Sequence, residues 1–223
     1  MAHPAGASPG HEVPKERFVP VTTATVAAVA PAPDLAPLSP TLDRLRAHVL
    51  RHSLKQGDFT LKSGARSTWF LDTKQTACRG DGIVAVTDAL IERLGSDLED
   101  VDAIGGLTMG SDPVAFGVAA VLATRGYVVR SFSVRKEAKQ GGITGRIAGA
   151  LEPGDRVLVT EDTTTRGTSL MEAAEQVRRF GAEVSLMTAV VDRGGTCAAM
   201  AAERGIDYRP LLTAPDLGYP FGS

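Results

Sequence analysis

The chain has 223 residues, and 43% of them are hydrophobic, which is enough for one α/β domain with a full core. Its formal net charge of −2 leaves no excess of basic residues, so the composition argues against nucleic acid binding. Two distant cysteines, Cys78 and Cys197, predict reduced thiols in a cytoplasmic protein, and no run reaches the roughly 18 apolar residues that a membrane span needs.

Residues 1–40 form a compositional zone of their own. Eight of the 13 prolines lie there, interleaved with alanine, and such a segment can bury little apolar surface. We expect a disordered tail without a secretory signal, because no uninterrupted apolar stretch follows a basic start. The globular domain is then expected to span residues 41–223.

Apolar periodicity and glycine or proline breaks divide the rest of the chain into helices and strands. A helix is expected from Thr41 until Gly57, followed by two short strands around Gly64 that form a hood. The later elements are expected at residues 83–94 (helix), 102–113 (a short strand running into a glycine-rich turn), 113–125 (helix), 128–134 (strand), 135–146 (polar loop), 147–150 (strand), 157–159 (strand), 170–180 (helix), 184–191 (strand), 198–204 (helix) and 208–212 (strand).

This alternation predicts a parallel sheet that helices cover on both faces, since strands and helices follow one another at βαβ spacing. Ligands of such folds bind at the carboxyl ends of the strands. The polar turns of this chain fall at those ends, where we therefore expect the functional site.

Histidine is not expected to take part in the chemistry of that site. All four histidines lie within the first 52 residues, ahead of the polar turns. Catalysis by a Ser-His-Asp or Cys-His arrangement and a histidine-rich zinc site are therefore improbable. If the protein is an enzyme, its chemistry must then rest on charge stabilisation by lysine, arginine, carboxylates or a hard cation.

The most informative stretch is RVLVTEDTTTRGTS, at residues 156–169. A buried strand leads into an acidic pair, Glu161 and Asp162, and then into a turn and an amphipathic helix. The N-terminus of a helix attracts phosphate through its unpaired N–H groups, whereas the carboxylates suit the hydroxyls of a neighbouring sugar. We call residues 163–169 the phosphate loop; its members are Thr163, Thr164, Thr165, Arg166, Gly167, Thr168 and Ser169.

A cationic segment follows the strand expected at residues 128–134. Arg135, Lys136 and Lys139 lie beside a glycine-rich stretch that includes Gly141. Charge runs are usually solvated surface. A flexible cationic loop, however, can close over pyrophosphate and neutralise its charge.

Residues that could bind a ligand also follow two further strands. The turn at residues 105–110, which includes Thr108 and Met109, offers backbone amides to pyrophosphate. Arg193 follows the strand expected at residues 184–191 and can clamp a carboxylate in a bidentate manner.

These motifs resemble those of type I phosphoribosyltransferases, and of orotate phosphoribosyltransferases in particular. TEDTTTRGTS is similar to the motif that binds phosphoribosyl pyrophosphate (PRPP), RKEAK to the catalytic loop, and FTLKSG at residues 59–64 to a PRPP-contacting segment. The matches follow the family's order from Phe59 to Arg193.

The resemblance implies a type I phosphoribosyltransferase fold, in which a small hood subdomain accompanies the parallel sheet. It also implies transfer of the 5-phosphoribosyl group from PRPP to orotate, giving orotidine 5′-monophosphate and pyrophosphate in pyrimidine (UMP) biosynthesis. Mg²⁺ is expected to be held mainly through PRPP and water rather than by protein ligands. The family's proteins are homodimers, in which the cationic loop serves the neighbouring subunit's site.

The resemblance also assigns roles to individual residues. Arg135, Lys136 and Lys139 are expected to bind PRPP and to act in catalysis. The other expected PRPP contacts are Lys62, Thr108, Met109, Gly141, Glu161, Asp162 and the phosphate loop. The expected orotate contacts are Phe70, Leu71, Thr165 and Arg193.

Three positions depart from the family's pattern. Met109 stands where a lysine is frequent, Gly141 where a histidine is frequent, and Glu161 where the first member of an aspartate pair is common. The first two changes each remove a contact to a charged group, which costs about 1.5–3 kcal/mol. The phosphate loop is the expected place for compensation.

Two alternatives stay open at this point. One is a phosphoribosyltransferase for another base, such as a purine or uracil, against which Arg193 argues because neutral bases offer no carboxylate. The other is a PRPP-sensing regulator without catalysis, against which the RKEAK loop argues.

Overall fold

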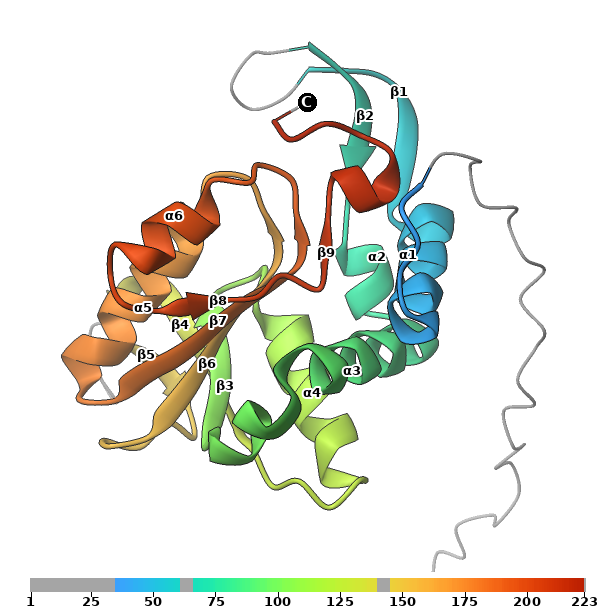
Figure 1. Cartoon of the computed structure of the whole chain (residues 1–223). Helices are drawn as coiled ribbons and strands as arrows, with labels where there is room; N and C mark the ends of the chain where they lie inside the picture. The colour runs from blue at the N-terminus through green and yellow to red at the C-terminus, as the bar shows by residue number, and fades with distance from the viewer. Residues whose placement is uncertain (1–34, 61–65, 140–144, 223) are drawn as a thin grey trace, which may run out of the picture.

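The computed structural model describes residues 35–60, 66–139 and 145–222. Within these ranges a seven-stranded sheet forms the middle layer of the molecule (Figure 1). Its strands lie in the order β5-β4-β3-β6-β7-β8, and β9 also pairs with β7. Their bounds are Ala103–Leu107 (β3), Arg130–Lys139 (β4), Gly145–Gly149 (β5), Arg156–Thr164 (β6), Glu183–Asp192 (β7), Asp207–Tyr208 (β8) and Leu212–Thr213 (β9).

The predicted parallel α/β sheet is confirmed, with one addition. Strands β3, β4, β6, β7, β8 and β9 pair in parallel, whereas β5 pairs with β4 in antiparallel fashion at one edge. Because β3, β4, β6 and β7 run in the same direction, their carboxyl ends meet along one side of the sheet.

Helices cover both faces of this sheet (Figure 1). On one side lie α1 (Pro40–His52), α3 (Gly80–Leu94) and α4 (Asp112–Ala123); on the other lie α5 (Thr168–Phe180) and α6 (Cys197–Ala202). Successive residues of β6 serve the two layers in turn: Leu158 belongs to the first core cluster, and Val157 and Val159 belong to the second. A continuous apolar run is therefore what this strand requires.

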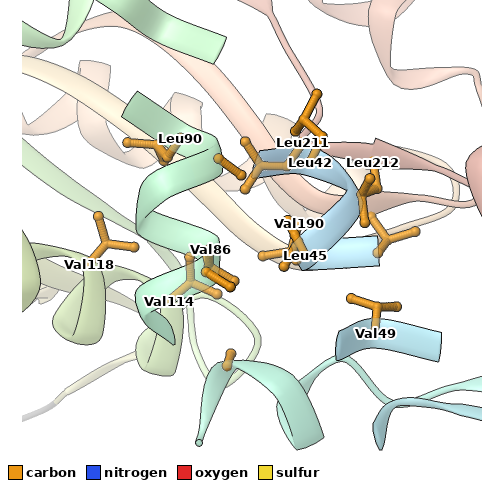
Figure 2. Close-up of a cluster of buried hydrophobic side chains, with 14 of the residues drawn as sticks. Leu42, Leu45, Val49, Val86, Leu90, Val114, Val118, Val190, Leu211 and Leu212 are labelled. Atoms are coloured by element: carbon orange, nitrogen blue, oxygen red, sulfur yellow. The ribbon is translucent and has the colours of Figure 1, made fainter. Parts of the chain in front are cut away.

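The first core cluster joins the helical layer to the C-terminal part of the sheet. Figure 2 shows its members from α1, α3 and α4 gathered with residues of β7 and the chain near β9. The labelled side chains are Leu42, Leu45, Val49, Val86, Leu90, Val114, Val118, Val190, Leu211 and Leu212.

The hood expected after the first helix is present as an antiparallel pair, β1 (Leu54–Thr60) and β2 (Arg66–Leu71). In β2 the buried residues alternate with exposed ones, and Trp69 is almost fully buried. The C-terminal segment runs beside both strands (Figure 1), and its Tyr219 stacks on Trp69 with ring centroids 4.2 Å apart. The hood is thus tied to the end of the chain.

Four predicted boundaries differ from the structure. The first helix ends at His52 rather than at Gly57, because Leu54 pairs with Leu71 in the hood. The segment at residues 135–146, predicted as a loop, is strand up to Lys139 and again from Gly145, and these two residues pair. Strand β6 continues through the acidic pair, because it pairs with β7 over its whole length. The last expected strand consists of two short strands, β8 and β9.

The folded part of the chain also begins before residue 41. Leu38 packs against the first core cluster, and Arg46 donates a hydrogen bond of 2.9 Å to the carbonyl of Ala36. Ser39 caps α1 by accepting a hydrogen bond of 3.2 Å from the amide of Leu42. Residues 35–40 therefore pack with the start of α1, and residues 1–34 of the expected tail lie outside the described ranges.

Candidate active site

A cleft of about 290 Å³ lies at the carboxyl ends of β3 and β6. It brings together side chains from four separate parts of the chain, as the parallel sheet predicts. The residues that line it are Lys74, Leu107, Thr108, Met109, Gly110, Lys136, Glu161, Asp162 and Ser169. Six of the sequence-predicted site residues are in this set, from three different polar turns.

The glycine-rich turn after β3 lies directly on the acidic pair. A Cβ atom at Gly110 would overlap the carboxylate of Glu161, so this close approach requires glycine. The peptide bond between Thr108 and Met109 is cis. Met109 itself is 68% exposed and extends from the cleft wall.

Hydrogen bonds fix the same turn to its neighbours. The amide of Thr108 donates to the carbonyl of Val134 on β4 at 2.8 Å. Asp112, in the first turn of α4, accepts from the hydroxyls of Thr108 at 2.6 Å and of Ser133 at 2.7 Å. This acceptor of two hydroxyls holds β3, β4 and α4 in register at the cleft.

The acidic pair is buried and has two different charge states. Burial, together with the hydrogen bond and the charge of Asp162, raises the pKa of Glu161 well above its usual range. Asp162 forms an ion pair of 2.5 Å with the Nζ of Lys74. At neutral pH the pair therefore consists of a neutral carboxylic acid and a carboxylate with its own cation.

Lys74 is a cleft residue that no sequence motif identifies. It is the first residue of α2 (Lys74–Ala77), a single turn that follows the hood. The preceding Thr73 is fully buried, and its hydroxyl forms a hydrogen bond with that of Thr163 in the phosphate loop. A single lysine after a strand has no periodicity or spacing that could reveal this contact.

The phosphate loop leads into α5 as predicted. The hydroxyl of Thr164 accepts a hydrogen bond of 3.0 Å from the amide of Gly167, which has a left-handed φ of 79° at the N-cap position. A side chain at Gly167 would also meet the Sγ of Cys197 at 3.0 Å. Thr165, Arg166 and Thr168 are exposed in this loop, beside the first helical turn, whose N–H groups have no partner within the helix.

Arg135, Lys136 and Lys139 of the cationic segment lie on β4. Arg135 is half-buried, whereas Lys136 and Lys139 are exposed, and of these three Lys136 lines the cleft. Arg146 on β5 donates a hydrogen bond of 2.6 Å to the carbonyl of Arg135 and forms an ion pair with Glu172 on α5. The edge hairpin is thereby attached to the helix of the phosphate loop. Lys62 and Gly141 lie outside the described residues.

Arg193 is buried where β7 ends, next to the phosphate loop. Its guanidinium lies over the ring of Trp69, 4.0 Å from the ring centroid, and its amide donates to the carbonyl of Thr164 at 2.8 Å. Burial lowers the pKa of this arginine. Arginine remains charged at neutral pH even so, because its ordinary pKa is above 12.

The two hood residues expected to contact orotate face in opposite directions. Phe70 is 38% exposed and packs near Phe59 of the other hood strand. Leu71 is only 6% exposed, and its side chain belongs to the first core cluster. The side chain of Leu71 therefore packs in the core, which leaves its backbone as the part that can meet a ligand.

Asp192, immediately before Arg193, organises the turn after β7. Its carboxylate accepts hydrogen bonds of 2.9 Å from the amides of Gly194 and Gly195 and one of 3.1 Å from the hydroxyl of Tyr208. This arrangement fixes the backbone that carries Arg193. No motif separates such a structural aspartate from a ligand-binding one in the sequence.

Over residues 35–60, 66–139 and 145–222, no helix is long and apolar enough to cross a membrane. Over the same residues, no group of three or more His, Cys, Asp and Glu side chains is placed to hold a metal ion.

Comparison with known proteins identifies relatives over most of the chain. No family model matches it. An orotate phosphoribosyltransferase of Streptomyces avermitilis is 38% identical over 182 residues, which cover 79% of this chain and 99% of the relative. One of Synechocystis sp. is 35% identical over 202 residues, covering 88% of this chain and 96% of the relative.

Solved structures of such enzymes have the same fold. Orotate phosphoribosyltransferase of Mycobacterium tuberculosis H37Rv in complex with Fe(III) dicitrate has a TM-score of 0.72 at 34% identity, covering 80% of this chain and 99% of that one. The same enzyme in complex with PRPP has a TM-score of 0.68 at 31% identity, with the same coverage. The chain belongs to the orotate phosphoribosyltransferase family.

Proposed function

We propose that this protein is a transferase that moves the 5-phosphoribosyl group from PRPP to orotate, giving orotidine 5′-monophosphate and pyrophosphate. This reaction belongs to pyrimidine (UMP) biosynthesis. The observation that carries the proposal is the convergence of the acidic pair, Lys136 and the start of α5 at one cleft, in a chain of this family.

The ribose and its 5′-phosphate are assigned to β6 and the phosphate loop. Both carboxyl groups can accept hydrogen bonds from ribose hydroxyls, because the single O–H of a neutral Glu161 is used by Asp162. The exposed hydroxyls of Thr165 and Thr168 and the N–H groups at the start of α5 then surround the 5′-phosphate.

The pyrophosphate is assigned to the turn after β3 and to the cations of β4. As the bond between C1′ and the pyrophosphate oxygen breaks, its electron pair leaves with pyrophosphate and C1′ becomes positively charged. Lys136, with Arg135 before it and Lys139 after it on β4, stabilises the departing charge. A ring nitrogen of orotate supplies the electron pair of the new bond, and because the orotate ring can enter already deprotonated at that nitrogen, no general base is required.

The acceptor base is assigned to the space bounded by the hood and the end of β7. Arg193 is the side chain that can bind the carboxylate of orotate in a bidentate manner, with its guanidinium oriented by Trp69. Thr165 and Phe70 are exposed in the same part of the molecule and are proposed as further contacts. Lys62, in the segment between β1 and β2, is proposed as a PRPP contact by family resemblance.

We further propose that the reaction requires Mg²⁺ held by the substrate. The residues of the cleft fit such an arrangement, because Asp162 already has Lys74 as its counterion and Glu161 is neutral. Mg²⁺ held by the substrate would neutralise part of the pyrophosphate charge.

Homodimer formation and a cytoplasmic location complete the proposal. Val84 on α3 and Phe116 on α4 are large apolar side chains that are exposed on neighbouring helices, as an interface requires. Both cysteines are free, which suits a reducing compartment. Sedimentation analysis of the purified protein tests the dimer, and a monomeric mass would contradict it.

The proposed reaction is tested by mixing the protein with PRPP, Mg²⁺ and orotate and following the loss of orotate absorbance. We expect turnover that a chelator abolishes and that added Mg²⁺ restores. Release of pyrophosphate with a purine or uracil, but not with orotate, would favour a different acceptor base. Binding of PRPP without turnover of any base would favour the regulator.

A further inference from the structure

We propose that Lys74 binds PRPP and, together with Lys136, supplies the positive charge of the cleft wall. The inference rests on the proposed function and adds to it a substrate-binding residue. Among the described residues that line the cleft, Lys74 and Lys136 are the cationic ones. They lie on α2 and β4, two elements that are far apart along the chain.

The contact between Lys74 and Asp162 leaves the ammonium accessible to a ligand. The two charged atoms are 2.5 Å apart, and the side chain of Lys74 is 39% exposed whereas that of Asp162 is 8% exposed. The carboxylate is therefore buried behind the ammonium, while part of the lysine side chain remains open to the cleft. One N–H of an ammonium reaches Asp162, and two others are available for phosphate or pyrophosphate oxygens.

The charge of the cleft floor explains why a cation is required there. PRPP is a polyanion, and an unpaired Asp162 would repel it from the cleft that it must enter. With Lys74 paired to Asp162 and Glu161 neutral, the floor has no net charge, and Lys136 then makes the cleft positive. Lys74 thus determines whether this acidic floor attracts or repels the substrate.

Lys74 is also fixed in position before substrate arrives. Thr73 is buried and bonds to Thr163 of the phosphate loop, and the amide of Asp72 donates to the carbonyl of Ser53 at 3.0 Å. Burial opposes the charge on Lys74, but the hydrogen bond to Asp162 and the charge of that carboxylate act against burial, and the pKa of Lys74 is raised. The ammonium is therefore preorganised beside the phosphate loop, which lowers the entropy cost of binding.

Met109 gives an internal means of testing the role of Lys74. It lines the same cleft but carries no charge, and its side chain is mostly exposed. A lysine at position 109 would add an ammonium to the cleft without entering the core. It would not replace the ion pair that Lys74 on α2 forms with Asp162.

The first experiment compares the wild-type protein with Lys74→Met. Losing one contact to a charged group predicts an increase of about 10- to 100-fold in the KM for PRPP and in the Kd for PRPP measured by calorimetry. The KM for orotate should change by less than about threefold, because Lys74 does not contact the base. Arg179→Met, which removes an equal charge at the far end of α5, is the matched control and should leave all three constants unchanged.

The second experiment adds Met109→Lys to the Lys74→Met protein and examines Lys74→Arg alongside it. We expect the added lysine to recover about tenfold in PRPP affinity and the arginine variant to stay close to wild type. Thermal unfolding of each variant shows whether a change in affinity accompanies a loss of folding.

Two results would overturn the inference. One is a Lys74→Met protein that stays folded and binds PRPP as tightly as the wild type. The other is an equal loss for both substrates, with a lowered melting temperature and no recovery from Met109→Lys, which would assign Lys74 to folding alone. Failure of the wild type to transfer phosphoribose to orotate would instead overturn the proposed function, while PRPP calorimetry would still decide the role of Lys74.

Discussion

Glu161 and Asp162 are neighbours in the sequence, yet the structure gives them different charges. Glu161 is buried beside another carboxylate and has a raised pKa, whereas Asp162 has Lys74 as its counterion. Glutamate in place of the family's usual aspartate therefore keeps a hydrogen-bonding group at this position without adding a second negative charge. Two acceptor groups side by side suit two adjacent hydroxyls of a ribose.

The raised pKa of Glu161 predicts a stability that depends on pH. The folded protein keeps the proton up to about pH 9, whereas the unfolded chain loses it near 4.5, so stability should fall as pH rises between these values. The slope from this one group is at most about 1.4 kcal/mol per pH unit. Glu161→Gln should remove it, which urea unfolding of both proteins across this pH range can measure. Parallel stability curves for the two proteins would contradict the assignment.

Arg193 provides the second prediction at the residue scale. Arg193→Lys keeps a positive charge but loses the planar fork that binds a carboxylate through two hydrogen bonds. We expect the KM for orotate to rise by about 10- to 100-fold while the KM for PRPP changes little. Steady-state kinetics with each substrate varied in turn measure this difference. An equal rise in both KM values would show that Arg193 acts on the fold of the site rather than on the base.

At the scale of elements, the hood and the C-terminal segment form one unit. Tyr219 stacks on Trp69 and accepts a hydrogen bond of 3.1 Å from Gln56. Trp69 also packs against the guanidinium of Arg193. The segment after β9 therefore connects the two strands of the hood to the residue that is proposed to bind the base.

This connection predicts that Tyr219→Ala lowers both stability and base binding. Loss of the aromatic stack and of the packing area should cost about 1–3 kcal/mol of unfolding free energy and raise the KM for orotate. Tyr219→Phe keeps the ring and loses only the hydrogen bond to Gln56, so it should cost no more than about 1 kcal/mol. Chemical denaturation and kinetics of the two variants measure these effects. Equal unfolding free energies and equal KM values for orotate in the two variants would show that the aromatic stack contributes to neither.

At the scale of the whole molecule, the sequence predicts the sheet and most of the cleft. Its buried strands are short apolar runs, and its polar turns follow them, so parallel pairing brings Thr108, Lys136 and Glu161 to one edge. The end of the first helix is less predictable, because Leu54 fits both a helical stripe and the alternation of a strand. The hairpin of β4 and β5 is hidden by its charged and glycine-rich sequence.

Lys74 lies beyond what the sequence pattern can show. Its role depends on a single helical turn being placed next to Asp162, which is 88 residues away in the chain. The acidic pair could be recognised from its motif, but its division into a neutral acid and a paired carboxylate depends on burial and on this distant lysine. Tertiary contacts, rather than local propensity, decide both the role of Lys74 and the different states of the two acids.

The central claim is tested most directly by comparing kcat/KM for orotate with that for uracil, which has the same ring without the carboxylate. The account predicts a preference for orotate of about 100-fold or more, because uracil offers no carboxylate that the buried guanidinium of Arg193 could bind. Equal or better turnover of uracil, or no turnover of either base in the presence of PRPP and Mg²⁺, would contradict it.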